Sequence, residues 1–374
     1  MQVPHIFQTR LALTSITALA LGVAAAPASA SRIDGPGHVF TSTNDAAGNA
    51  VLVYERGLVG TLQLVLTAPT GGNGTGAGLG SQGALAFSTD HKYLFVVNAG
   101  SNSLSTFLLS SKGMQLMSTV ASGGSGPISV AERSGTVYVL HSGVGAKLVG
   151  FQNVEGQLTP LADGVRTLSD DTIDVGPAEV SFDPLGRTVM VTEKNTSQID
   201  TWRAAPDGTL GAILVTPSAG ATPFGFVFDP AGHAIVSEAK GGADGSGASS
   251  YRFAGKAPQT PVVVTASLGT GQAAACWSAA TPDGHWAFTA NAGSGSISSF
   301  AIDGKGALTL AQAQAEVVDG SHPIDMAVSP TGRRLFVLNT GSGNIASFAL
   351  GGQGRLQPLS SVDVPLTAAG LLTR

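Results

Sequence analysis

Charge is scarce in this sequence. Only 11% of the 374 residues are Asp, Glu, Lys or Arg, whereas an average soluble protein has about 25%. The 19 Lys and Arg residues are outnumbered by 24 Asp and Glu residues, which gives a net charge of −5. A chain with this balance does not attract phosphate backbones or anionic lipids. We therefore expect no nucleic-acid partner and no membrane partner.

Cysteine is nearly absent. Because Cys276 is the single cysteine, no internal disulfide can form, and stability has to come from a large core. The sequence also has no H-x-x-x-H spacing and no calcium-loop pattern. We therefore expect neither a metal nor a cofactor. Cys276 is interpreted as a small buried hydrophobic residue, since no base stands beside it in the sequence.

Long hydrophobic runs are missing except at the N-terminus. Residues 1–10 form a short cationic lead, residues 11–25 are apolar, and Ala28-Ser29-Ala30 has the A-x-A form of a cleavage site. The apolar run is too short to cross a bilayer. We interpret residues 1–30 as a signal peptide, which leaves residues 31–374 as one exported domain, periplasmic or secreted.

Glycine, in contrast, is abundant, and it accompanies an internal repeat. The 51 glycines show no G-X-Y period, so they are expected to serve turns. In each repeat a polar residue ends a β-rich run and an aromatic residue follows about nine positions later. The pairs are Asn44 and Tyr54, Asn98 and Phe107, Ser142 and Phe151, Glu193 and Trp202, Glu238 and Tyr251, Asn291 and Phe300, and Asn339 and Phe348.

The repeat predicts an all-β fold. Its seven units recur about every 49 residues, within the range of a four-stranded propeller blade. Pro-x-Gly sequences such as Pro330-Thr331-Gly332 predict the hairpin turns inside each blade. The first unit lacks an inner strand before residues 38–42, and the unassigned strand-like segment is residues 370–374. We predict a seven-bladed β-propeller whose C-terminal strand closes the ring, since sheets avoid open edges.

The repeated Asn-Ala-Gly-Ser motifs at 98–101 and 291–294, the Asn-Thr-Gly-Ser motif at 339–342 and the Ala274-Ala275-Cys276-Trp277 stretch carry a family resemblance. With the Pro-x-Gly turns, they make the chain resemble the exported branch of the lactonase-like seven-bladed propellers. The relatives include 6-phosphogluconolactonase and a fungal carboxymuconate cycloisomerase. The resemblance covers essentially all of residues 31–374 and implies activity on a lactone or a related small carboxylated ring.

The chain departs from this family where the relatives usually have an Arg-His pair. The matching segment reads Gly176-Pro177-Ala178-Glu179, so Ala178 and Glu179 replace the pair. An acidic residue of the relatives matches Lys194, one position after Glu193. The resemblance therefore implies the fold, while the family's usual catalytic residues are not all present.

A propeller binds ligands at the mouth of its central channel. The inner strands begin on the face where the second strands end, which we call the start face, and the Pro-x-Gly turns lie on the opposite turn face. We predict the mouth on the start face. There Glu179, Glu193, His141 and Glu238 are the candidate catalytic bases, and Lys194, Lys240, His322 and Asp325 are the candidate ligand-binding residues.

Two interpretations of these residues remain open. In the first, the protein hydrolyses or isomerises a lactone. In the second, it is a non-catalytic propeller that binds a small ligand or an exported protein, and the same side chains cap strands and line a water-filled channel. In either case we expect a monomer. The third-strand aromatics are expected to form the core between blades.

Three further predictions concern loops. His91, His233 and His285 stand on turn-face segments and are expected to have no part in function. The glycine-rich stretches 71–80 and 241–247 precede no helix and lack a Gly-Lys-Ser/Thr end, so they are interpreted as loops and not as phosphate sites. The second of them is expected to form a lip at the channel mouth.

Overall fold

The computed structural model describes Met1 and residues 37–57, 60–240, 245–254, 260–317 and 320–374. The chain divides into two units, Met1–Ala30 and Ser31–Arg374. Residues 2–30 of the predicted signal peptide and residues 241–244 of the predicted lip lie outside the described residues. Within the described part of the chain, no helix is long and apolar enough to span a membrane.

In the described part of the chain, twenty-eight strands form seven four-stranded antiparallel sheets. Blade 2 contains β4 (Leu85–Phe87), β5 (Tyr93–Asn98), β6 (Ser103–Ser110) and β7 (Gly113–Ala121). Blade 3 contains β8 (Pro127–Arg133), β9 (Thr136–His141), β10 (Lys147–Val154) and β11 (Gln157–Thr167). Blade 4 contains β12 (Pro177–Phe182), β13 (Thr188–Glu193), β14 (Gln198–Ala204) and β15 (Leu210–Pro217). Blade 5 contains β16 (Pro223–Phe228), β17 (Ala234–Ala239), β18 (Ser246–Ala254) and β19 (Thr260–Gly269). Blade 6 contains β20 (Ala275–Ala280), β21 (Trp286–Asn291), β22 (Ser296–Ile302) and β23 (Leu308–Val317). Blade 7 contains β24 (Pro323–Val328), β25 (Arg334–Asn339), β26 (Asn344–Leu350) and β27 (Leu356–Asp363).

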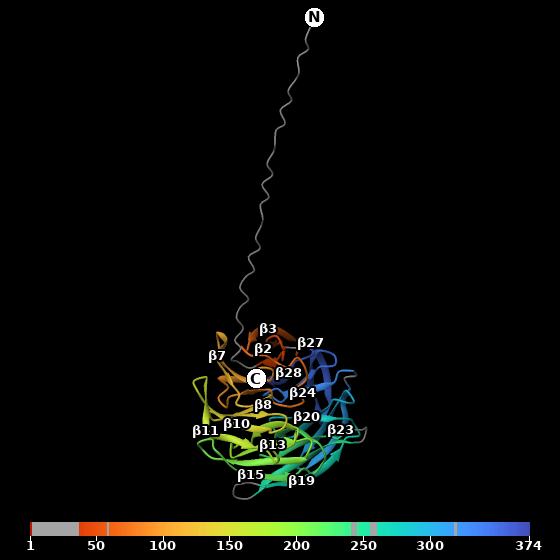
Figure 1. Cartoon of the computed structure of the whole chain (residues 1–374). Coiled ribbons are helices and arrows are strands. Elements are labelled where there is room, and N and C mark those ends of the chain that lie inside the picture. The colour runs from red at the N-terminus through yellow and green to blue at the C-terminus, as the bar shows by residue number, and fades with distance from the viewer. Residues whose placement is uncertain (2–36, 58–59, 241–244, 255–259, 318–319) are drawn as a thin grey trace. The chain divides into compact units, whose positions relative to one another are not determined.

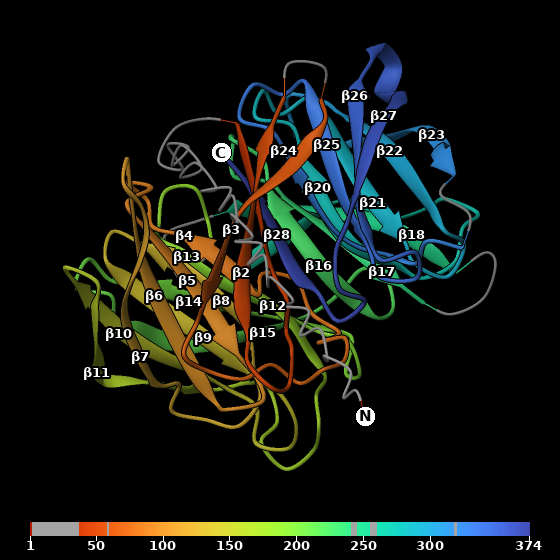
Figure 2. The same ribbon diagram turned by 90° about the horizontal axis from the view of Figure 1, so that it is seen from above.

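The first blade combines three strands from the start of the unit Ser31–Arg374 with one strand from its end. It contains β1 (His38–Ser42), β2 (Ala50–Arg56) and β3 (Leu62–Pro69), and its innermost strand is β28 (Ala369–Thr373). β28 pairs antiparallel with β1, and Phe40 faces Leu372. Figure 2 shows the dark blue β28 beside the orange strands of this blade. The predicted propeller and its C-terminal closing strand are confirmed.

The blades surround a central channel in the order that the repeat predicts. In Figure 1 the inner strands β28, β24, β20 and β8 lie near the centre, and the outer strands β3, β7, β11, β15, β19, β23 and β27 lie at the rim. The third-strand aromatics are at most 3% exposed and belong to the core; they are Phe107, Phe151, Trp202, Tyr251, Phe300 and Phe348. The repeated aromatic position is therefore a packing position.

Candidate functional site

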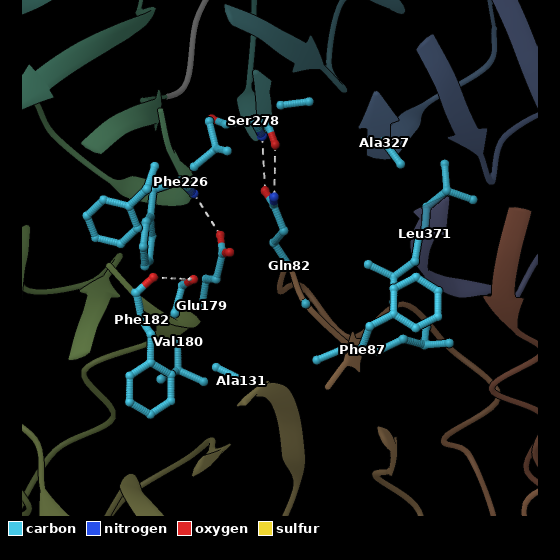
Figure 3. A pocket seen from close by; sticks show the side chains of 18 of the residues that line it. Gln82, Phe87, Ala131, Glu179, Val180, Phe182, Phe226, Ser278, Ala327 and Leu371 are labelled. Atoms are coloured by element: carbon cyan, nitrogen blue, oxygen red, sulfur yellow. Dashed lines mark hydrogen bonds between the residues drawn. The ribbon is translucent and has the colours of Figure 1, made fainter. Parts of the chain in front are cut away.

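The inner strands of all seven blades line one cavity of about 500 Å³ on the channel axis. Gln82 and Glu179 line its inner end, near the starts of the inner strands, and Arg133 and Thr373 line it at the ends of those strands. The cavity therefore extends toward the turn face. Figure 3 shows the side chains that surround its hollow.

The start face of the channel is crossed by residues 79–82, which we call the strap. The strap comes from the loop before β4 in blade 2. The indole Nε1 of Trp277 in β20 donates to the Ser81 carbonyl at 2.9 Å. Gln82 reaches the same strand, because its amide Nε2 donates to the Ser278 carbonyl at 2.9 Å and its Oε1 accepts from the Ser278 amide at 3.0 Å (Figure 3). The predicted mouth is thus spanned by chain.

Two predicted site residues, Glu179 in β12 and Asp325 in β24, line the central cavity. They are 7% and 3% exposed. The Phe226 amide donates to Glu179 Oε2 at 2.7 Å, and the Met326 amide donates to Asp325 Oδ1 at 2.8 Å. These backbone donors fix both carboxyl groups without neutralising them.

Burial controls the acidity of this pair. Desolvation raises the pKa of Asp325 to about 8 against the opposing effect of two backbone hydrogen bonds. Desolvation also raises the pKa of Glu179 well above its usual range, and the nearby charge of Asp325 raises it further. Near neutral pH Asp325 is therefore largely protonated, and burial favours the protonated form of Glu179 as well.

Lys194, a predicted ligand-binding residue, holds the strap. Its Nζ donates to the Gly80 carbonyl at 2.5 Å and lies 4.7 Å from the centre of the Phe224 ring. Burial lowers the pKa of Lys194. Lys240, the other predicted lysine, is exposed and does not line the central cavity.

A second cavity of about 330 Å³ lies against the strap. Its lining includes residues 78–81 and the side chains of Trp277, His322 and Asp325. Asp325 thus contacts both cavities, and His322, which is exposed, contacts the second one. Two predicted ligand-binding residues are brought together here.

Glu193 and His141 end the second strands of their blades, Glu238 is the last residue but one of β17, and none of the three lines either cavity. Each is at most 1% exposed. The Ser122 hydroxyl lies 3.0 Å from His141 Nε2, and burial lowers the pKa of His141 to about 4. The hydroxyl of Ser249 donates to Glu238. Burial raises the pKa of Glu238.

Glu193 contacts a loop and a second acid that the sequence did not single out. The amide of Ser169 donates to Glu193 Oε1 at 3.0 Å and to Asp200 Oδ2 at 3.1 Å. Its hydroxyl also donates to Glu193 Oε2 at 2.6 Å. Burial, followed by the contact with Glu193, raises the pKa of Asp200 to about 9. A protonated Asp200 therefore shares this site with Glu193, and the pair anchors the loop that leads to β12.

Cys276 is 8% exposed, in the core beside Trp277. Burial raises the pKa of its thiol to about 12. A thiol with this pKa remains protonated near neutral pH and is a poor nucleophile, which agrees with the interpretation of Cys276 as a buried hydrophobic residue.

Comparisons with known proteins support the resemblance. Residues 255–369 match the family described as lactonase, 7-bladed beta-propeller. A search of curated proteins found no match to this sequence. The lactonase-like resemblance expected from the sequence is confirmed over residues 255–369 by this family match, and the neighbours that follow share the propeller fold.

Several solved structures share the fold. A putative 6-phosphogluconolactonase from Bacteroides fragilis is 18% identical, with a TM-score of 0.70 over 92% of this chain and 99% of that chain. The periplasmic gluconolactonase of Pseudomonas aeruginosa is 19% identical, with a TM-score of 0.70 over 90% and 98%. A hypothetical selenium-binding protein from Sulfolobus tokodaii is 10% identical, with a TM-score of 0.62 over 90% and 92%. At these identities the likeness concerns the fold.

Proposed function

We propose that this protein is an exported hydrolase that opens a lactone ring in the central cavity. The observation that carries the proposal is the pair of buried carboxyl groups, Glu179 and Asp325, in a cavity of about 500 Å³. A cavity of this size suits a small cyclic ester. The lactonase family match and the lactonase neighbours support the reaction class. The N-terminal sequence and the periplasmic neighbour support export.

The two carboxyl groups divide the chemistry between them. Asp325 as the carboxylate takes a proton from water, and the resulting hydroxide adds to the lactone carbonyl carbon. Glu179 stays protonated and donates a hydrogen bond to the developing oxyanion. Its proton sits on Oε1, because Oε2 already accepts from the Phe226 amide. The intermediate then breaks the ring C–O bond, and the proton returns from Asp325 to the leaving alkoxide. The product is a hydroxy acid.

Substitution of the pair tests the proposal. Asp325→Asn and Glu179→Gln should each lower kcat/KM for lactone hydrolysis by roughly 100-fold or more, as the loss of a general base or an oxyanion donor does. Asp283→Asn is the matched control, because Asp283 is an exposed turn-face residue. Unchanged hydrolysis in both folded variants would remove the catalytic role of the cavity.

The catalytic roles first predicted for Glu193, Glu238 and His141 stay predictions. Glu193→Gln and Glu238→Gln keep the size of each side chain and remove its charge, although one accepting oxygen becomes a donor, so thermal melting is measured alongside turnover. Loss of turnover with unchanged melting would place the reaction near these second-strand ends. Retained turnover would leave it in the central cavity.

The non-catalytic interpretation has one observation in its favour. Lys194, which could hold an anionic substrate, is instead bonded to the Gly80 carbonyl of the strap. A binding propeller would retain a small ligand in the cavity and release it unchanged. Ligand affinity without turnover in the parent protein would favour this alternative.

A further inference from the structure

Three phenylalanine side chains line the central cavity where the inner strands end. Phe87, Phe182 and Phe228 are the last residues of β4, β12 and β16, and all three are half-buried. We call them the phenylalanine collar. Figure 3 shows Phe87 and Phe182 on opposite sides of the cavity.

Aromatic neighbours hold the collar in place. Phe87 packs edge-on against Phe40, with ring centres 5.2 Å apart. Phe182 lies 6.1 Å from Tyr138, and Phe228 packs edge-on against Phe226 at 5.7 Å. Rings that are fixed in this way can contact a ligand without losing side-chain entropy when it binds.

The other blades mostly continue this apolar surface. At the same level blades 6, 7 and 1 contribute Ala280, Val328 and Leu372. Polar residues interrupt it at this end, namely Glu132 and Arg133 of blade 3, Asp183 directly after β12, and Thr373 of β28. Both Glu132 oxygens are already occupied, since Oε1 accepts from Gly135 and Oε2 accepts from Thr89. Arg133 forms no ion pair within the described residues and is half-buried.

Polar side chains deeper in the cavity are largely paired with protein groups. The Gln82 amide is used on both atoms by Ser278. The Ser278 hydroxyl donates to the Gly225 carbonyl at 3.2 Å, and the Ser181 hydroxyl donates to the Phe182 carbonyl at 3.4 Å. A sugar lactone would bring several hydroxyl groups that lose water, and the donor groups of these side chains are already used by protein acceptors, which leaves fewer partners to replace that water.

From the collar and the paired polar side chains we infer that the cavity takes lactones with a hydrocarbon substituent and few or no ring hydroxyls, in preference to sugar lactones. The ester group would face Glu179 and Asp325, and the hydrocarbon would lie along the collar. This inference rests on the proposed lactone hydrolysis for its ring chemistry. The preference for hydrocarbon rests on the collar and on the paired polar side chains, not on the hydrolysis.

A comparison of two six-membered lactones tests the inference in the parent protein. One is a δ-lactone with a five-carbon alkyl chain on the ring carbon next to oxygen, and the other is glucono-δ-lactone. We expect kcat/KM for the alkyl lactone to be at least roughly tenfold higher than for glucono-δ-lactone. The reason is that an apolar pocket typically changes kcat/KM by this factor or more when a substrate gains a few carbon atoms. Equal or faster hydrolysis of glucono-δ-lactone would overturn the inference and leave lactone hydrolysis standing.

Collar variants give a second test. Phe182→Ser and Phe228→Ser should each raise KM for the alkyl lactone roughly tenfold and change KM for glucono-δ-lactone little. Leu359→Ser, on the exposed face of β27, is the control. Thermal melting verifies that each variant is folded. An unchanged KM for the alkyl lactone in both folded variants would overturn the role of the collar.

Binding of unreactive lactams separates the inference from the proposed function. The two lactams that correspond to the lactones are titrated into the parent protein by calorimetry. Tighter binding of the alkyl lactam, weakened by Phe182→Ser, would support the inference even if no lactone were hydrolysed, in which case the proposed function alone would fail. Binding of neither lactam, or tighter binding of the sugar lactam, would overturn the inference.

Discussion

Gln82 and Ser278 pair across the central channel through two hydrogen bonds. The Gln82 amide donates to the Ser278 carbonyl at 2.9 Å and accepts from the Ser278 amide at 3.0 Å (Figure 3). The Gln82 side chain, from the loop before blade 2, thereby hydrogen-bonds both backbone groups of Ser278 in β20, the inner strand of blade 6. Gly225 makes this close approach possible, since a Cβ atom there would lie only 2.0 Å from Gln82 Oε1. The pair separates the central cavity from the start face.

Removal of the Gln82 amide should destabilise the ring. Gln82→Leu leaves the amide and the carbonyl of Ser278 without these partners, and unpaired buried backbone groups cost about 1–3 kcal/mol each. We expect a loss of that order in the free energy of unfolding, measured by denaturant titration. Gln63→Leu is the matched control, because Gln63 is exposed on β3. Equal stability of the two variants would contradict the bridging role of Gln82.

Gly370 in the closing strand should not accept a side chain. Its φ is +77°, and a Cβ atom would lie 2.2 Å from Leu85 Cδ1 and 3.0 Å from the Ala84 Cβ. Gly370→Ala should therefore lower the free energy of unfolding by about 1–3 kcal/mol. Gly304 has open space around it and no positive φ, so Gly304→Ala should change stability little. Similar melting temperatures for both variants would argue against this tight closure of the ring.

Asp325 should make the protein less stable as pH rises. Its pKa is about 8 in the folded state and about 3.9 in an unfolded chain. Between these values the folded state binds one more proton than the unfolded state, so the free energy of unfolding falls with rising pH. Asp325→Asn removes this dependence.

The measurement is the stability difference between Asp325→Asn and the parent at pH 5 and at pH 7. The variant should gain on the order of 2 kcal/mol relative to the parent over this interval, since one proton corresponds to about 1.4 kcal/mol per pH unit. Asp283→Asn, an exposed control whose pKa is lowered, should show no such gain. A constant difference for Asp325→Asn would show that this carboxyl is already ionised at pH 5.

The propeller was predictable because each blade repeats the same local solution. An aromatic residue at the third-strand position, such as Phe107 or Trp202, is buried in blade after blade. The closing strand followed from a missing inner strand before His38. Signals of this kind depend on local pattern and sheet pairing, which the sequence carries directly.

The channel geometry was not predictable in the same way. The sequence showed residues 71–80 as a glycine-rich loop, but not that the following residues cross the axis to reach Ser278. That contact joins segments far apart in the chain and has no repeat to reveal it. The polar residues at the ends of the second strands illustrate the same limit. Asn98 and Glu193 occupy equivalent positions, and both are buried and hydrogen-bonded to neighbouring side chains. The sequence showed that the two residue types differ, but not that their surroundings are alike.

The pH dependence of kcat/KM for lactone hydrolysis tests the central claim most directly. The uncatalysed alkaline hydrolysis is subtracted at each pH. If the Asp325 carboxylate is the base, kcat/KM should rise about tenfold per pH unit below pH 7 and level off near pH 8, the pKa of Asp325. Asp325→Asn should lose both the rate and this inflection. A flat profile in the parent, or an unchanged inflection near pH 8 in a folded Asp325→Asn variant, would contradict the proposed role of Asp325 in the central cavity.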